Sequence, residues 1–299
     1  MGGIDPPRLM RIATIASMVV AITLIGAKSV AWLATESVSM LSSLVDSALD
    51  LVASLVTFIA VRQALTPADA DHRFGHGKAE ALAGLTQAGF IAASGGGLLL
   101  TVGDRLVHPH QVQRELVGVF VSAGAILLTI LLVAFQNYVV RRSGSIAIGA
   151  DSAHYRTDIV SNVAVGGALY LAGLWQMPAI DAGVAAIIAV YLMHGAWSVS
   201  RGSIDVLMDR ELPPEERERI LAIVRNHPGV RSVHDLRTRS AGLTKFIQLH
   251  VVLEPTMSLG RAHVIGDTIE AAIEDAFPRA EVILHIDPWN DSESRRPAD

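Results

Sequence analysis

The chain has 299 residues, of which 51% are hydrophobic and only 18% charged, and its mean hydropathy is +0.42. Soluble enzymes carry about a quarter charged residues, so this composition excludes an ordinary soluble enzyme and indicates a membrane protein. The net charge of -5 gives no basic field for holding phosphate backbones, which argues against a nucleic-acid binder. The chain has no cysteine, so any metal must be held by histidine and carboxylate.

Charged residues are concentrated toward the C-terminal end of the chain. Of the 53 Lys, Arg, Asp and Glu residues, 28 lie in the last 94 positions. This shift in composition predicts a membrane domain followed by a water-soluble one. We expect a transmembrane domain over 1–205, a water-soluble domain over 206–290, and a disordered tail over 291–299.

Six apolar stretches of the first domain are long enough to cross a hydrocarbon core of about 30 Å, which takes about 20 helical residues. The stretches are 10–33, 38–64, 80–105, 115–140, 146–173 and 178–200. Segments containing proline, glycine or charged residues separate them. The first stretch has no small-residue cleavage motif and is too long for the apolar region of a signal peptide, so we expect it to persist as a helix.

The positions of Lys and Arg predict the orientation, because short cytoplasmic loops carry an excess of positive charge. One side of the membrane has only Arg105 and Arg114. The other side has Arg8, Arg11, Arg62, Arg73, Lys78, Arg141, Arg142 and Arg201. We therefore expect both termini in the cytoplasm.

Two of the apolar stretches contain pairs of ionisable residues, which cost a few kcal/mol at the bilayer centre and need a reason to be there. Asp46 and Asp50 lie in the second stretch, and His154 and Asp158 lie in the fifth. Each pair has i, i+4 spacing, which stacks its members on one helix face. At about 1.5 Å per residue, each pair lies roughly 12–18 Å from the point where its helix enters the membrane, so both reach the midplane.

We interpret these side chains as a cage of three carboxylates and one imidazole, the ligand number that tetrahedral Zn²⁺ prefers. The alternative is a set of polar contacts that tie helices together. Three acids with a single nearby base repel one another unless a cation or protons neutralise them, which favours the cage. Arg156 also lies in the fifth stretch, but we do not take it as the base that neutralises these acids. Its i+2 offset from His154 points it to another helix face. Four more polar residues have no assigned role: Glu36, Gln87, Asn162 and Asp181.

The sequence contains neither the H-E-x-x-H string of a zinc protease nor the G-x-x-x-x-G-K-[ST] loop that binds a nucleotide. An enzyme and a nucleotide-driven pump are therefore disfavoured, and transport driven by an ion gradient is left. Metal binding expels protons from imidazole and carboxyl ligands, and histidine titrates near neutrality, so we expect exchange of Zn²⁺ for protons. A second class stays open, a zinc-sensing membrane scaffold or receptor without net transport.

Taken together, the motifs resemble the cation diffusion facilitator family, and within it the bacterial zinc/proton antiporters of the ferrous-iron efflux type. The matching features are Asp-x-x-x-Asp in the second stretch, His-x-x-x-Asp in the fifth, the string FGHGKAE from Phe74 to Glu80, and a histidine-rich C-terminal domain. The likeness runs from about Arg8 to Trp289. It implies a homodimer in the bacterial inner membrane that exports Zn²⁺, with 1–205 as its six-helix transport domain and 206–290 as its cytoplasmic metal-binding and dimerisation domain. One imidazole among carboxylates also suits Cd²⁺, and Fe²⁺, Co²⁺ and Mn²⁺ accept such ligands too.

The loop after the second stretch holds Asp69, His72 and His76, spaced so that a turn could bring two imidazoles and a carboxylate around one ion. Composition alone equally allows a solvated loop with incidental histidines. The resemblance assigns a second zinc site to these three positions. It also implies a charge link in the dimer between Lys78 and Asp209, where the alternative for Lys78 is a simple positive-inside anchor.

The sequence of the C-terminal domain predicts a small α+β sandwich. We expect a helix over 214–226, strands over 230–239 and 244–253, a helix over 258–276 and a strand over 280–287. The second strand alternates apolar and polar residues, as a half-buried strand does. This α-β-β-α-β order covers one face of the sheet with helices, and the resemblance implies a metallochaperone-like domain with the same layout.

Histidines of the C-terminal domain are the third candidate metal site. His285 and Asp287 share one face of the last strand, because side chains alternate with a period of two. Taken singly, each histidine is more often an ordinary surface residue. The resemblance places a binuclear zinc site on His234, His250, His263, His285 and Asp287, with Asp287 able to bridge two ions. Ile286 stands where that family has a glutamine, which removes one polar contact.

Overall fold

The structure is a computed structural model of the whole chain, and it describes residues 5–36, 38–107, 116–175 and 178–290. The chain divides into two compact units, residues 1–204 and 205–299, and each is described by itself. The expected tail over 291–299 lies outside the described residues. So do Arg114 and the side chains of Arg105 and Asp181.

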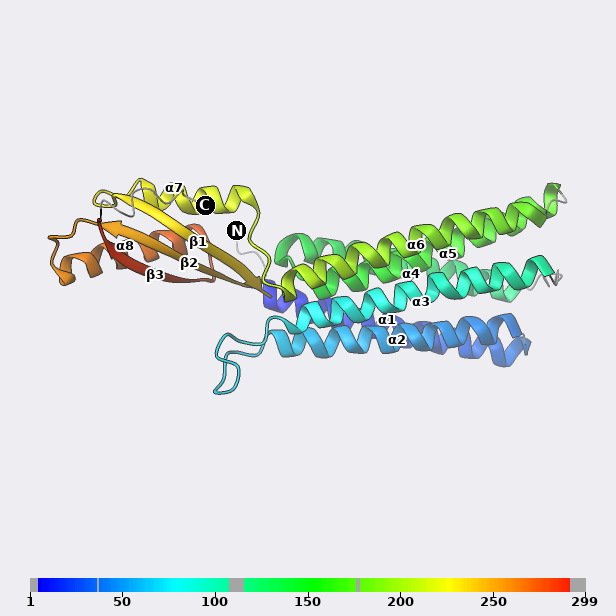
Figure 1. Cartoon of the computed structure of the whole chain (residues 1–299). Helices are drawn as coiled ribbons and strands as arrows, with labels where there is room; N and C mark the ends of the chain where they lie inside the picture. Colours follow the sequence, from blue (N-terminus) through cyan, green and yellow to red (C-terminus); the bar gives the residue numbers. More distant parts are fainter. Residues whose placement is uncertain (1–4, 37, 108–115, 176–177, 291–299) are drawn as a thin grey trace. The chain divides into compact units, whose positions relative to one another are not determined.

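The first unit consists of long helices that run side by side (Figure 1), where the apolar stretches predicted them. They are α1 (Pro6–Thr35), α2 (Val38–Ala64), α3 (Ala79–Val107), α4 (Leu116–Ser143), α5 (Ile146–Trp175) and α6 (Pro178–Leu207). Among the described residues, α1, α2, α3, α4 and α6 are long and apolar enough to cross a membrane. Helix α5 is 30 residues long and carries the charged residues Asp151, Arg156 and Asp158.

Proline and glycine fix several helix ends in this unit. Pro6 and Pro178 open α1 and α6, where the first turn needs no N–H donor from them. Helix α4 is followed by Gly144, whose φ of +69° lies in the left-handed region that glycine adopts without a Cβ clash. The Gly144 N–H donates to the Val140 carbonyl at 2.7 Å, so the end of α4 is capped before α5 begins.

Small residues allow α3 to pack closely on α6. A Cβ atom added to Gly84 would lie 2.2 Å from Ser203 Oγ, and one added to Gly95 would lie 3.2 Å from Leu192 Cβ. Helices in membranes approach most closely where such small side chains face each other. The buried apolar side chains of this contact are Ile91, Ile188, Leu192 and Ala196.

The second unit has the predicted α+β fold. Its elements are α7 (Pro214–Arg225), β1 (Ser232–Ala241), β2 (Thr244–Leu253), α8 (Leu259–Ala276) and β3 (Ala280–Pro288). The strands lie in the order β1-β2-β3, with β1 antiparallel and β3 parallel to β2. Helix α8 makes the crossover that a parallel pair requires (Figure 1).

Alternation along β2 separates an apolar face from a polar one. Ile247, Leu249, Val251 and Leu253 are buried with side chains of α7 and α8 in one core. Gln248 is exposed and His250 is half-buried. The helices therefore cover one face of the sheet, and the histidine-bearing positions face the other way.

Candidate metal sites

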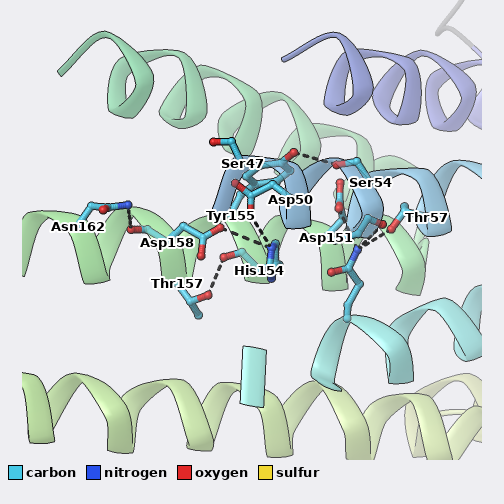
Figure 2. Close-up of polar contacts among 12 residues, drawn as sticks. Ser47, Asp50, Ser54, Thr57, Asp151, His154, Tyr155, Thr157, Asp158 and Asn162 are labelled. Atoms are coloured by element: carbon cyan, nitrogen blue, oxygen red, sulfur yellow. Dashed lines mark hydrogen bonds and ion pairs between the residues drawn. The ribbon is translucent and has the colours of Figure 1, made fainter. Parts of the chain in front are cut away.

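Three of the four charged residues predicted at the midplane meet between α2 and α5 (Figure 2). Nε2 of His154 lies 3.3 Å from Oδ1 of Asp50 and 3.6 Å from Oδ2 of Asp158. One ligand atom from each of the three lies within 4.8 Å of the others. The His154 side chain is only 5% exposed. This is an N/O ligand set of the kind that divalent transition metals accept.

Asp46 stands apart from this group. It lies one turn before Asp50 on α2, and its side chain is exposed. Its carboxylate interacts electrostatically with that of Asp50 but does not join the three ligand atoms that lie within 4.8 Å. The helix spacing thus brings the two acids to the same side of α2, and Asp46 as a fourth ligand stays a prediction.

The surroundings of His154 are partly aromatic. The rings of Phe90 and Tyr155 have their centroids 6.1 and 5.9 Å from that of the imidazole. Within the described residues, Nδ1 of His154 is buried and has no hydrogen-bond partner, so only Nε2 faces the acids. Asn162, which had no assigned role, donates to the Asp158 carbonyl at 2.8 Å and so supports the turn of α5 that carries this acid.

Lys28 of α1 is a second base beside the acids that the sequence analysis missed. Its Nζ donates to Ser47 Oγ at 2.6 Å and to the Ser43 carbonyl at 3.1 Å, both on α2. The ammonium interacts electrostatically with the acids Asp46, Asp50 and Asp158. The expectation of a single base near three acids is therefore wrong, since α1 packs against α2 and contributes its own cation. Lys28 lies inside an apolar stretch, where a charged residue is energetically costly, so the sequence alone could have marked it as a candidate functional residue.

Asp151 is a further buried acid that the sequence analysis missed (Figure 2). Its Oδ2 accepts hydrogen bonds from Ser17 Oγ at 2.9 Å and Gln136 Nε2 at 2.7 Å, and its Oδ1 accepts one from Gln87 Nε2 at 3.1 Å. Gln87, which had no assigned role, also donates to Thr57 Oγ1 at 2.9 Å. Neutral donors from α1, α3 and α4 thus satisfy this carboxylate, and its hydrogen bonds connect these helices to α5.

The three predicted loop ligands also come together. Nδ1 of His72 lies 3.3 Å from Oδ1 of Asp69, and Nε2 of His76 lies 3.3 Å from Oδ2 of Asp69. Asp69 accepts hydrogen bonds from the backbone N–H groups of His72 and Asp71 at 2.7 and 3.0 Å. The bond from the His72 N–H is the main cause that lowers the pKa of the Asp69 carboxyl. The loop therefore presents an ionised carboxylate between two imidazoles.

Three histidines form a row across the sheet of the second unit. In the strand register His234 pairs with His250, and His250 pairs with His285. Oδ2 of Asp287 lies 2.8 Å from His250 Nδ1 and 3.7 Å from His234 Nε2, and its Oδ1 lies 3.2 Å from His285 Nε2. The Asp287 carboxylate therefore faces three imidazoles. Ligand atoms of His234, His250 and Asp287 lie within 4.8 Å of one another, and His285 contacts Asp287 without joining that group.

Two residues depart from the expected ligand set of this unit. His263 on α8 is 75% exposed, with its Nδ1 3.5 Å from Asp267, and it does not join the other ligands. Asp235, which was not singled out, has Oδ2 3.8 Å from His250 Nε2. It adopts a φ of +49° where β1 bulges, and a hydrogen bond from Arg237 is the main cause that lowers its pKa. The bulge is what turns this carboxylate toward the row.

The remaining predicted residues lie outside these clusters. Lys78 and Asp209 belong to different units, so their charge link stays a prediction. Oδ1 of Asp209 lies 3.4 Å from Arg239 Nη1 within its own unit. Glu36 follows α1 with a φ of 49°, and its N–H donates to the Trp32 carbonyl at 2.7 Å, so its role is to end the helix.

Comparison with known proteins covers both units. Two family models match the chain, the cation efflux transmembrane domain over residues 14–208 and the cytoplasmic domain of cation efflux proteins over residues 212–289. The cation-efflux pump FieF of Shewanella oneidensis is 46% identical over 281 residues, which are 93% of this chain and 94% of that protein. FieF of Cronobacter sakazakii is 44% identical over 284 residues, which are 95% and 94% of the two chains. A solved zinc form of CzrB is 37% identical and covers 29% of this chain and 99% of its own, with a TM-score of 0.26.

Proposed function

Because this chain belongs to the cation diffusion facilitator family of cation efflux transporters, we propose that it exports Zn²⁺ from the cytoplasm in exchange for protons. It is an integral membrane protein that moves divalent metal cations, and not an enzyme. The observation that carries the finer proposal is the cluster of Asp50, His154 and Asp158 on two apolar helices.

The proposed cycle takes place at this cluster, with Asp46 as the fourth ligand. Metal binding requires a neutral imidazole and ionised carboxylates, so the arriving Zn²⁺ expels protons, and protons that arrive from outside expel the metal. Rocking of helices around a fixed midplane site would open it alternately to each side of the membrane. We place both termini in the cytoplasm and the protein in the bacterial inner membrane.

The ligand chemistry decides which metals are candidates. One imidazole among carboxylates suits Zn²⁺, and we propose Cd²⁺ as a second substrate. Fe²⁺, Co²⁺ and Mn²⁺ accept the same donor types, and the order of affinities for divalent ions alone does not select among them. The metal here is the cargo, which must be bound and then released.

The first prediction concerns coupling to protons. In proteoliposomes with the cytoplasmic face outward, a lumen about one pH unit more acidic than the medium should accelerate Zn²⁺ uptake several-fold, because outward proton flow drives the exchange. The measurement is the initial uptake rate with a zinc-sensitive dye, with and without an ionophore that collapses the gradient. The same assay across Cd²⁺, Fe²⁺, Co²⁺ and Mn²⁺ gives the substrate range.

Equal rates with and without the gradient would rule out proton exchange. No uptake of any metal, in a protein that still binds zinc through its C-terminal domain, would instead favour the second candidate, a zinc-sensing scaffold. The row of histidines on the sheet is the feature that keeps this candidate open, since it offers a group of metal ligands that belongs to the second unit.

We propose that the loop and C-terminal clusters bind zinc to deliver ions or to regulate transport. The loop cluster of Asp69, His72 and His76 follows directly on a transmembrane helix, so it is suited to pass ions to the transport site. The cluster on the sheet would stiffen a homodimer held through the C-terminal domain, with Lys78 and Asp209 as a charge link near the membrane. His263 is exposed and would complete the site when another chain or a rearranged helix brings it near.

The second prediction concerns the C-terminal site. Replacing His250 by alanine should weaken zinc binding to this site by at least about tenfold, because His250 is the central imidazole of the row and contacts Asp287. Zinc binding is measured by titration calorimetry on the full chain in detergent, in an Asp50→Ala, Asp69→Ala background. Gln248→Ala, an exposed neighbour on the same strand, is the matched control. Undiminished binding in His250→Ala would exclude the row as a metal site.

A further inference from the structure

We propose that Lys28 is a resident counter-charge of the transport site, which keeps the formal charge around the bound metal balanced so that a divalent ion is held and then released. The proposal rests on the proposed function, since it takes Asp50, His154 and Asp158 as the metal-binding group. It assigns a role in transport to a residue outside that group.

The geometry fixes the Lys28 ammonium beside the acids. Its Nζ lies 2.6 Å from Ser47 Oγ and 3.1 Å from the Ser43 carbonyl. Ser47 lies between Asp46 and Asp50 in the sequence of α2, so the ammonium is held at the level of both acids. An ammonium has three donor hydrogens, and two of them hold it against α2 at Ser43 and Ser47, within one turn of Asp46 and Asp50.

The formal charges explain why a cation is useful at this place. Lys28 interacts electrostatically with three carboxylates, those of Asp46, Asp50 and Asp158. Three carboxylates and one ammonium have a formal charge of −2, equal and opposite to that of a divalent metal ion. Without the ammonium, the same acids would leave one negative charge uncompensated when the metal is bound. Unit charges interact strongly where water is scarce, so this excess would tighten the hold on the metal.

A transport site must bind its ion well enough to load and weakly enough to unload. A fixed positive charge near the acids lowers the affinity for metal without removing a ligand. The alternative is that Lys28 only ties α1 to α2 through its two hydrogen bonds. The two roles differ in what happens to metal affinity when the charge is removed: the counter-charge predicts tighter binding, and the tie predicts unchanged or weaker binding.

The test uses Lys28→Met and Lys28→Gln in the full chain. Asp69→Ala and His250→Ala are added to weaken metal binding at the loop and C-terminal clusters. We expect both variants to bind Cd²⁺ at least roughly tenfold more tightly by titration calorimetry, because each removes one positive charge near a divalent ion. In uptake assays the KM should fall together with the maximal rate, since release becomes slower. Lys28→Arg keeps the charge and should stay close to the parent.

The controls separate this proposal from its alternatives. Thr23→Val removes a hydroxyl on α1 that donates only to the Val19 carbonyl of its own helix, and it should change neither affinity nor rate. Lys28→Gln removes the charge but keeps an N–H donor, so it tests the charge if Lys28→Met does not fold. Unchanged or weaker Cd²⁺ binding in the folded charge-removing variants would overturn the counter-charge. If Asp50→Ala in the same background binds Cd²⁺ like the parent, the proposed transport site itself fails.

Discussion

Replacing Asp50 by alanine is expected to reduce the initial rate of Zn²⁺ uptake by at least about 100-fold. Losing an outer partner of a metal ligand costs 10–100-fold in affinity or activity, and Asp50 is itself one of the three groups whose ligand atoms lie within 4.8 Å. Only His154 and Asp158 would then be left in that group. The measurement is uptake of Zn²⁺ into proteoliposomes that contain equal amounts of each protein.

The control for this prediction is a change that removes a carboxylate elsewhere. Asp275→Ala takes away an exposed acid of α8 and should transport at the parent rate. Uptake by Asp50→Ala at more than half of the parent rate would contradict the assignment of this acid to the transport site. The melting temperature of each variant in detergent shows whether a lost rate reflects a lost fold.

Replacing Asp151 by alanine is expected to lower the free energy of unfolding by about 1–3 kcal/mol. The change removes the acceptor that Ser17, Gln87 and Gln136 share. Ser17 and Gln87 keep other acceptors, but one N–H of Gln136 is left unpaired, and a buried unpaired donor costs about 1–3 kcal/mol. The melting temperature of the purified protein in detergent should therefore fall by several degrees, while Asp151→Asn, which keeps an acceptor oxygen, should lose less.

An Asp151→Ala variant that melts with the parent would show that this network does not hold the helices together. Comparing the stability and the KM of the Asp151 variants also separates a structural role of Asp151 from a role in transport. If Asp151 only joins α1, α3 and α4 to α5, then the Asp151→Asn variant should retain its KM for Zn²⁺ even where it is less stable.

The sequence predicts the helices and strands well because both follow from local patterns. The apolar stretches give the long helices of the first unit, and alternation along β2 gives the sheet of the second. Helical spacing also predicts that Asp50, His154 and Asp158 lie at a similar distance from the membrane surface, since the rise per residue sets that distance. The helices and strands, and the positions of these residues along them, can therefore be predicted from local patterns.

The lateral neighbours of each helix are not set by local patterns. Lys28 reaches the acids because α1 packs on α2, and Gln87 reaches Asp151 because α3 packs beside α5. Hydropathy gives the depth of such residues but not the direction in which they point. Asp46 shows the same limit, because correct spacing along α2 does not bring its carboxylate into the cluster.

The C-terminal domain shows a second reason why parts of the candidate sites cannot be predicted from local sequence patterns. Strand register brings His234, His250 and His285 into one row, and this register comes from pairing between distant segments. The bulge that turns Asp235 toward the row leaves no clear mark in the sequence. His263 has the right residue type, but its place on an exposed part of α8 depends on how that helix lies against the sheet.

The most direct test of the transport site is the position of the metal in a crystal of the full chain soaked in Cd²⁺, located by anomalous scattering. We predict an anomalous peak that places a Cd²⁺ ion between the carboxylates of Asp50 and Asp158 and Nε2 of His154, with the Asp46 carboxylate moved to become the fourth ligand. Peaks confined to the loop and the C-terminal domain, in protein from a preparation that transports Cd²⁺, would contradict it.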